Sequence, residues 1–137
     1  MRMSGTEEIS SVVHNYLEAL GEQDWPKLGQ TLAKGVVRMG PYGDVVEGDT
    51  AYRDFLCDVV SKLGDYVLRV QRVAAIDRTV WVRLSETFTE DSGRRLHAEE
   101  ALVFEVDGEA RISGVEVYLR KSEVVNAVAE PSSGSSA

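Results

Sequence analysis

The sequence is poor in the residues that build disulfide frameworks and metal centres. Its 137 residues include one cysteine, Cys57, and two histidines, His14 and His97. A lone cysteine excludes an internal disulfide, and two histidines are too few for a histidine-rich metal site. The chain carries no phosphate-binding loop, nucleophile elbow, CxxC or HExxH pattern. Nothing in it demands a metal, a nucleotide or another cofactor, so we expect none.

Basic charge and long apolar runs are also scarce. Lys and Arg number 15 against 23 Asp and Glu, which gives a formal net charge of −8. That balance argues against nucleic acid or an anionic membrane surface as the main partner. No run approaches the roughly 18 apolar residues of a membrane-spanning helix, and the opening MRMSGTEE has no apolar signal core. We therefore expect a cytoplasmic protein without a membrane partner.

The length suits one domain with one hydrophobic core. Of the 137 residues, 43% are hydrophobic, which is ordinary for a globular chain. We expect residues 1–121 to form a single domain. Residues 122–137 end in EPSSGSSA and are expected to be a flexible C-terminal tail.

The first half of the chain carries the pattern of three helices. Residues 6–20 place apolar side chains at the i, i+3, i+4, i+7 spacing of an amphipathic helix. A second, short helix begins at Asp24-Trp25-Pro26 and runs to about residue 33. A short strand over residues 35–39 follows, and Gly40-Pro41-Tyr42-Gly43 breaks it. The third helix starts at Gly48-Asp49-Thr50 and reaches about residue 63.

The second half is extended. Alternation and turn residues predict strands at about 66–76, 79–90, 95–106 and 110–120. The order of elements predicts an α+β domain. Three N-terminal helices pack on a curved, mainly antiparallel sheet, which forms a conical barrel with an internal pocket. The outer sheet face is a candidate homodimer surface, because it carries Trp81, Val103 and Tyr118.

Residues 96–120 read as a long β-hairpin around Asp107-Gly108. Alternation turns the even-numbered residues of its first arm toward the core, and Glu100 is the one charged residue on that apolar face. If Val106 pairs with Arg111, Glu100 lies opposite Val117. A carboxylate in that place needs a pocket or a partner.

A second carboxylate, Glu86, falls on the same face. A turn near Ser92 places residue 86 across from 98 and residue 84 across from 100. Glu86 and Glu100 are then diagonal neighbours, about 7 Å apart at their Cβ atoms. Two carboxyl groups on an apolar face do not both ionise easily, so the pKa of one rises and an acid stands beside a base.

The alternative is a structural salt bridge. A turn near Arg78 would put Arg72 beside Leu84, within reach of both glutamates, and a carboxylate–arginine cluster would stay ionised. The segment LRVQRVAAI does not alternate cleanly, which leaves room for a bulge. The sequence leaves both interpretations open.

Three phrases in this order resemble the nuclear transport factor 2-like superfamily, and within it the SnoaL-like and ketosteroid isomerase-like groups. They are VVHNYLEALGEQDWPKL, VEGDTAYRDFL and FEVDGEARISGVEVYLR, and the resemblance covers roughly residues 7–121. It implies a conical fold. It does not imply one function, because the superfamily hosts enzymes, binding proteins and assembly modules.

The resemblance carries over catalytic positions only in part. The isomerase tyrosine that donates to the substrate oxygen falls on Tyr16, but the base and the protonated aspartate fall on Gly40 and Leu102. Without a carboxylate at position 40 the usual isomerase mechanism is lost. The Asp–Arg–Asp set of the limonene epoxide hydrolases keeps a carboxylate at Glu86 only. The SnoaL-like polyketide cyclases use an inward acid or base, which a glutamate on another strand can replace.

Two functions follow as hypotheses. The first is a cofactor-independent isomerase, cyclase or hydrolase that acts on a small hydrophobic molecule through Glu100, Glu86 and Tyr16. The second is a non-catalytic ligand-binding or protein-interaction module of the same fold, which the substitutions at Gly40 and Leu102 favour. The expected pocket wall comprises Trp25, Met39, Tyr42, Phe55, Leu84, Phe88, Leu102, Phe104 and Val117.

Overall fold

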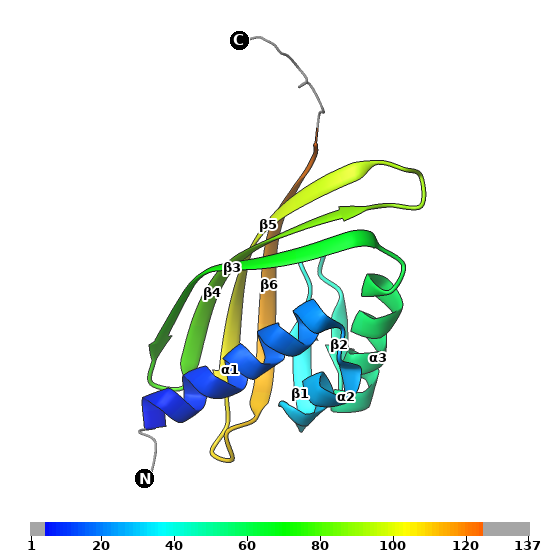
Figure 1. Cartoon of the computed structure of the whole chain (residues 1–137). Coiled ribbons are helices and arrows are strands. Elements are labelled where there is room, and N and C mark those ends of the chain that lie inside the picture. Colours follow the sequence, from blue (N-terminus) through cyan, green and yellow to red (C-terminus); the bar gives the residue numbers. More distant parts are fainter. Residues whose placement is uncertain (1–4, 125–137) are drawn as a thin grey trace.

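Three helices and six strands make up residues 5–124, the part of the chain that the computed structural model describes (Figure 1). The expected α+β class is confirmed. The helices are α1 (Gly5–Glu22), α2 (Trp25–Gln30) and α3 (Asp49–Val60). The strands are β1 (Leu32–Met39), β2 (Val45–Glu47), β3 (Gly64–Ile76), β4 (Thr79–Thr89), β5 (Arg95–Val106) and β6 (Ile112–Glu123).

The strands form one curved sheet in the order β2-β1-β6-β5-β4-β3. Neighbouring strands are antiparallel except β1 and β6, which run parallel. Within residues 5–124 the edge strands β2 and β3 do not pair with each other, so the predicted cone is an open sheet rather than a closed barrel. Figure 1 shows α1 crossing the concave face of this sheet, with α3 beside β1 and β2.

The helices form where the sequence supplies caps and apolar stripes. The amphipathic pattern of α1 buries Val13, Tyr16 and Leu17 against the sheet. Asp24 caps α2, because its carboxylate accepts a hydrogen bond from the backbone nitrogen of Lys27 at 3.1 Å. These contacts hold α1 and α2 over the concave face and leave the α3 end of the cone less completely filled.

The register between β4 and β5 agrees with the prediction, but that between β5 and β6 does not. Glu105 pairs with Gly114 while Val106 pairs with Ile112, so Ser113 is an extra residue in β6. This bulge shifts the hairpin. The turn adds a second displacement, because Val106 pairs with Ile112 and not with Arg111. Together they place Glu100 opposite Leu119, and the expectation that it faces Val117 was wrong.

The boundaries also differ in detail. β1 begins at Leu32, inside the predicted second helix, and β2 was not predicted. β6 continues to Glu123, past the expected domain boundary at residue 121, and the rest of the expected tail, from residue 125, lies outside the described residues. None of the helices in residues 5–124 has the length and apolar character needed to cross a membrane.

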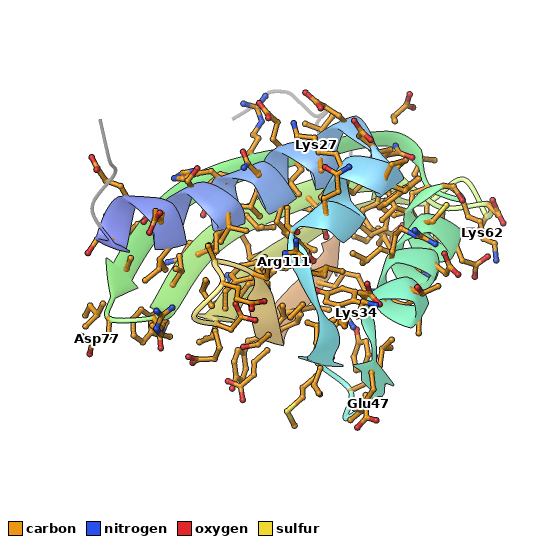
Figure 2. All side chains as sticks on the ribbon, turned by 90° about the horizontal axis from the view of Figure 1, so that it is seen from below. Lys27, Lys34, Glu47, Lys62, Asp77 and Arg111 are labelled. Carbon is orange, nitrogen blue, oxygen red and sulfur yellow. The ribbon has the colours of Figure 1, made fainter. Side chains whose placement is uncertain are left out.

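Side chains fill the layer between α1 and the sheet, as Figure 2 shows from below. Asp77, in the turn between β3 and β4, and Lys62, just after α3, lie at opposite ends of the molecule in this view. The best-buried aromatic contacts lie between these ends, where Phe104 of β5 meets the ring of Tyr16 edge-on with centroids 5.1 Å apart. A cavity lies on the α3 side of this contact.

Candidate active site

A cavity of about 290 Å³ lies between α1, α3 and the concave face of the sheet. Most of its wall is aliphatic or aromatic, and the polar groups that reach it are few. They come from β4 and β5 (Glu86, Glu100), from α1 (Tyr16) and from the rim (Arg38, Lys121). Pro41, Tyr42, Asp44 and Glu90 complete the rim, and Leu20, Phe55, Leu56, Val59, Val60, Leu63, Phe88, Ala98, Leu102, Val117 and Leu119 form the apolar wall.

Glu86 and Glu100 are diagonal neighbours, because Leu84 pairs with Glu100 and Glu86 pairs with Ala98. This register is the predicted one. Burial raises the pKa of Glu100 to about 10, and Glu86 adds to the shift as a hydrogen-bond partner and as a like charge. Arg38 and Lys121 oppose the shift more weakly. Glu100 is therefore a neutral carboxylic acid at pH 7.

Tyr66 of β3 is the hydrogen-bond partner of the second carboxyl group, that of Glu86. Its hydroxyl donates a hydrogen bond to Oε2 of Glu86, and burial together with the Glu86 carboxylate raises the pKa of Tyr66. Glu86 thus has hydrogen-bond donors on two sides, the phenol of Tyr66 and the protonated Glu100. The site places a neutral acid beside a carboxylate base.

Tyr16 contributes to the wall from α1, and Tyr52 of α3 lies behind it. The hydroxyl oxygens of Tyr16 and Tyr52 lie 2.6 Å apart, and both side chains are inaccessible to solvent. Burial and the neighbouring Tyr52 raise the pKa of Tyr16. Burial also raises the pKa of Tyr52, to about 12, although Tyr16 and Arg38 act against it. Both phenols stay protonated at neutral pH, and only Tyr16 lines the cavity.

Arg38 is the cation nearest to these groups. Its guanidinium carbon lies 4.9 Å from the centroid of Phe55 and 6.0 Å from that of Tyr52, which is cation–π geometry. One of its nitrogens lies 3.5 Å from Oδ2 of Asp44. The side chain of Arg38 is 12% exposed.

Arg72 does not reach the glutamates. The β3–β4 pairing shifts between Val70 and Arg72, and Arg72 pairs with Arg83. Both side chains are exposed on the convex face. The bulge in β3 turns Arg72 outward, so its predicted salt bridge to Glu86 and Glu100 was wrong.

The structure brings some of the predicted site residues together and leaves others apart. Tyr16, Glu86 and Glu100 all line the cavity, as do five of the predicted wall residues: Tyr42, Phe55, Phe88, Leu102 and Val117. The other four lie elsewhere. Leu84 and Phe104 are core, Trp25 packs against that core, and Met39 is 48% exposed beside Val103 and Glu116 on the convex face.

Sequence reasoning missed Tyr66, Tyr52 and Arg38. Tyr66 stands at the start of a strand whose alternation is broken by a bulge. Tyr52 lies on the buried face of α3, where an aromatic side chain gives no sign of a polar role. Arg38 had one available signal, since it lies two residues after Val36, which is fully buried, and same-face neighbours of a strand are two residues apart.

The polar groups of the cavity are of the kinds that transfer protons. No group of three or more His, Cys, Asp and Glu side chains in residues 5–124 is placed to hold a metal ion. The cavity instead combines a neutral acid, a carboxylate, a phenol donor and an arginine. These groups can donate and accept protons at a ligand oxygen without help from a cofactor.

An open α+β cone with an internal cavity defines the class of protein. The sequence profile of the SnoaL-like domain matches residues 13–115. The chain belongs to the SnoaL-like domain family, part of the nuclear transport factor 2-like superfamily that the sequence resembles.

Solved structures repeat this fold. An LEH-like epoxide hydrolase from M. tuberculosis is 20% identical, with a TM-score of 0.75 over 85% of this chain and 86% of its own. The epoxide hydrolase/cyclase-like enzyme SalBIII, of pyran ring formation in the polyether salinomycin, is 19% identical, with a TM-score of 0.78 over 89% and 100%. An NTF2-like protein of unknown function from Burkholderia pseudomallei is 18% identical, with a TM-score of 0.75 over 86% and 92%. No curated protein matches the chain by sequence.

Proposed function

We propose that this protein is a cofactor-independent acid–base enzyme that opens an epoxide, or closes a cyclic ether from one, in a small hydrophobic molecule. The observation that carries the proposal is the Glu100–Glu86 pair, a neutral acid beside a carboxylate in an apolar cavity. An epoxide hydrolase and an epoxide hydrolase/cyclase-like enzyme share the fold at 20% and 19% identity. That likeness supports a reaction class but does not assign the residues.

The pair has the complementary roles that such a reaction needs. Glu86 takes a proton from an attacking water, or from a hydroxyl of the substrate, as its oxygen bonds to a ring carbon. Glu100 gives its proton to the ring oxygen as the carbon–oxygen bond breaks. Afterwards Glu86 holds a proton and Glu100 is ionised. The hydrogen bond between the two carboxyl groups returns that proton to Glu100 and restores the starting state.

Tyr16 is the proposed hydrogen-bond donor to the substrate oxygen. An arginine can only donate, so the Tyr52 oxygen accepts from Arg38. In the proposed arrangement the Tyr52 hydroxyl donates to Tyr16, one of the two directions that the 2.6 Å contact between the hydroxyl oxygens allows. The Tyr16 hydrogen is then directed at the cavity. A chain of donors that ends on the ligand is strengthened by each earlier member.

The cavity limits the size of the substrate. An apolar cavity of about 150 Å³ holds one benzene ring, and this cavity of about 290 Å³ has nearly twice that volume. A ligand of roughly a dozen non-hydrogen atoms fits by the same proportion. The aliphatic wall from α3 favours a hydrocarbon body, with its oxygen atoms turned toward Glu100 and Tyr16.

The test is turnover of alkyl and aryl epoxides of that size in ¹⁸O-labelled water. The expected product is a diol that carries the label, or a cyclic ether where the substrate has its own hydroxyl. Rates are compared among the wild type, Glu100→Gln and Glu86→Gln over a range of pH. An acidic limb in the rate profile that survives both substitutions would exclude this assignment.

The convex face carries a second proposal, a homodimer formed through the sheet. Trp81 and Tyr118 are 43% and 57% exposed there, and partly exposed Val103 lies opposite Trp81 in the β4–β5 ladder. Sedimentation of the wild type and of Trp81→Lys tests this proposal. A monomer at all concentrations in the wild type would exclude it.

A further inference from the structure

Arg38 has more hydrogen-bond donors than partners. A guanidinium carries five N–H donors in a fixed fork. Within residues 5–124 the acceptors of this side chain are the Tyr52 hydroxyl and one oxygen of Asp44, at 3.5 Å. The side chain is only 12% exposed, and it lines the cavity. A charge this well buried is normally paired and fully hydrogen-bonded, and this pairing is incomplete.

Asp44 is a weak partner for Arg38, and its Oδ1 also accepts a hydrogen bond from the backbone nitrogen of Tyr42 at 3.3 Å. The side chain of Asp44 is 42% exposed, and its contact with Arg38 is one long N–O distance instead of the short bidentate pair that arginine forms with a well-placed carboxylate. The carboxylate rests over Gly40, where an added Cβ would lie 2.2 Å from Oδ2 and 2.3 Å from Oδ1. The pairing therefore depends on the missing side chain at position 40. Rotation of Asp44 into water would free the guanidinium.

We propose that Arg38 is the binding site for a carboxylate of the substrate, so that the substrate is a hydrophobic carboxylic acid. This inference rests on the proposed function, since it assigns the other end of the same ligand. The planar fork of arginine matches a carboxylate in two parallel hydrogen bonds, and the Phe55 ring beneath it fixes the plane of the fork. Asp44 holds this place while the cavity has no acid in it.

The other charges of the cavity permit an anion there. Glu100 is neutral and does not repel it. Glu90, on the rim, has its own cation in Arg94 at 3.8 Å. Lys121 lines the cavity and makes no ion pair within residues 5–124, so it adds positive potential. Glu86, a further carboxylate of the cavity wall, accepts a hydrogen bond from Tyr66, and Asp44 is the carboxylate that competes for Arg38.

The test compares two ligands that differ only at the anionic end. 4-Phenylbutyrate and 4-phenylbutanamide each have roughly a dozen non-hydrogen atoms, which matches the cavity. Each is titrated into the full-length protein at pH 7 and followed by ¹H–¹⁵N NMR, including the Nε–H signal of Arg38. We expect the acid to bind about tenfold more tightly than the amide. Arg38→Gln should abolish that ratio, and Lys62→Gln, which removes an exposed cation paired with Asp58, should preserve it.

Two further variants act on Asp44, the carboxylate that competes with the ligand for Arg38. They keep the test valid if Arg38→Gln does not fold. Asp44→Asn removes the competing charge. Gly40→Ala places a methyl group where the Asp44 carboxylate now rests. Both should raise the affinity for the acid about three- to tenfold and leave that for the amide unchanged.

The outcomes separate this inference from the proposed function. Equal affinities for the acid and the amide in the wild type, or no gain in Asp44→Asn and Gly40→Ala, would overturn the carboxylate site and leave the Glu100–Glu86 chemistry standing. Absence of binding by both compounds would overturn the carboxylate site and the ligand cavity together.

Discussion

Glu99 and Glu100 are adjacent in β5, yet their carboxyl groups lie in opposite environments. Glu99 points to the convex face, where Nε2 of His97 lies 2.5 Å from its carboxylate. That hydrogen bond holds the pKa of Glu99 below its usual value. Glu100 points into the cavity, where burial raises its pKa to about 10. Adjacent residues of a strand face opposite sides of the sheet, so the pKa shifts of Glu99 and Glu100 have opposite directions.

The difference shows what turns a glutamate into an acid catalyst. On the convex face a carboxylate meets water, His97 and the guanidinium of Arg83 at 3.9 Å, and all three favour the charge. On the concave face it meets hydrocarbon and a second carboxyl group, and both favour the proton. A group that must donate a proton at neutral pH needs the second environment.

Glu100→Gln is expected to have the largest effect on catalysis. Glutamine keeps the size of the side chain and can donate to Glu86, but it has no proton to transfer. The rate of epoxide opening should fall by about 10²–10⁴-fold. Glu99→Gln is the matched control and should leave the rate near that of the wild type. Initial rates of product formation, measured by chromatography, check both variants, and equal losses in the two would mean that the cavity is not where the chemistry occurs.

The same substitution should stabilise the fold above neutral pH. The folded-state pKa of Glu100 is raised from 4.5 to about 10. The stability that this group contributes is therefore fully present below about pH 4.5 and is lost as pH rises toward 10, because the unfolded chain ionises first. Glu100→Gln should raise the free energy of unfolding by about 1–3 kcal/mol at pH 8. Near pH 4 it should change nothing. Urea unfolding followed by circular dichroism measures both values.

Glu99→Gln should lower the free energy of unfolding, whereas Glu100→Gln should raise it. The pKa of Glu99 is lowered in the fold, so its contribution is present above its unfolded pKa and is lost as pH falls through the folded value. The variant should be slightly less stable than the wild type at pH 7 and equal to it in strong acid. A stability gain for both variants at pH 8 would contradict the comparison.

The pair itself could be predicted from the sequence because the β4–β5 hairpin is regular. Its strands alternate without a bulge, and its turn is marked by Asp91, Ser92 and Gly93. The alternation of side chains between the two faces and the position of one turn were then enough to place Glu86 diagonally from Glu100. The fold class followed from the order of the helices and strands together with the resemblance.

The partners of the pair could not be predicted because they lie on irregular strands. Two irregularities in β3 lie beside these residues, one between Gly64 and Val67 around Tyr66 and one between Val70 and Arg72. Alternation alone cannot place a bulge. β1 is similar, since its pairing with β6 shifts between Leu32 and Val37. The burial of β1 does not alternate regularly, so the two-residue spacing from Val36 was the one signal for Arg38. Asp44 reaches Arg38 from a loop, where no periodicity applies.

Tyr66→Phe should have the smallest effect and the most specific one. The variant removes the phenol that donates to Glu86 and leaves the aromatic ring in place. Without that donor one carboxyl oxygen of Glu86 loses its hydrogen bond, so the carbon-13 signals of the two carboxyl groups in the Glu86–Glu100 pair should move. Carbon-13 NMR of the glutamate side-chain carboxyl groups measures this change without any substrate.

Tyr118→Phe is the control from the convex face. The Tyr118 hydroxyl lies 3.4 Å from Oε1 of Glu116 in an exposed contact, which water can replace, so no carboxyl signal of the Glu86–Glu100 pair should move. If Tyr66→Phe also left every carboxyl signal unchanged, the phenol would not be a partner of Glu86. The division of the pair into acid and base would then rest on the burial of Glu100 alone. A shift confined to Tyr66→Phe would instead assign the proton at rest to Glu100, which is the state that the proposed reaction requires.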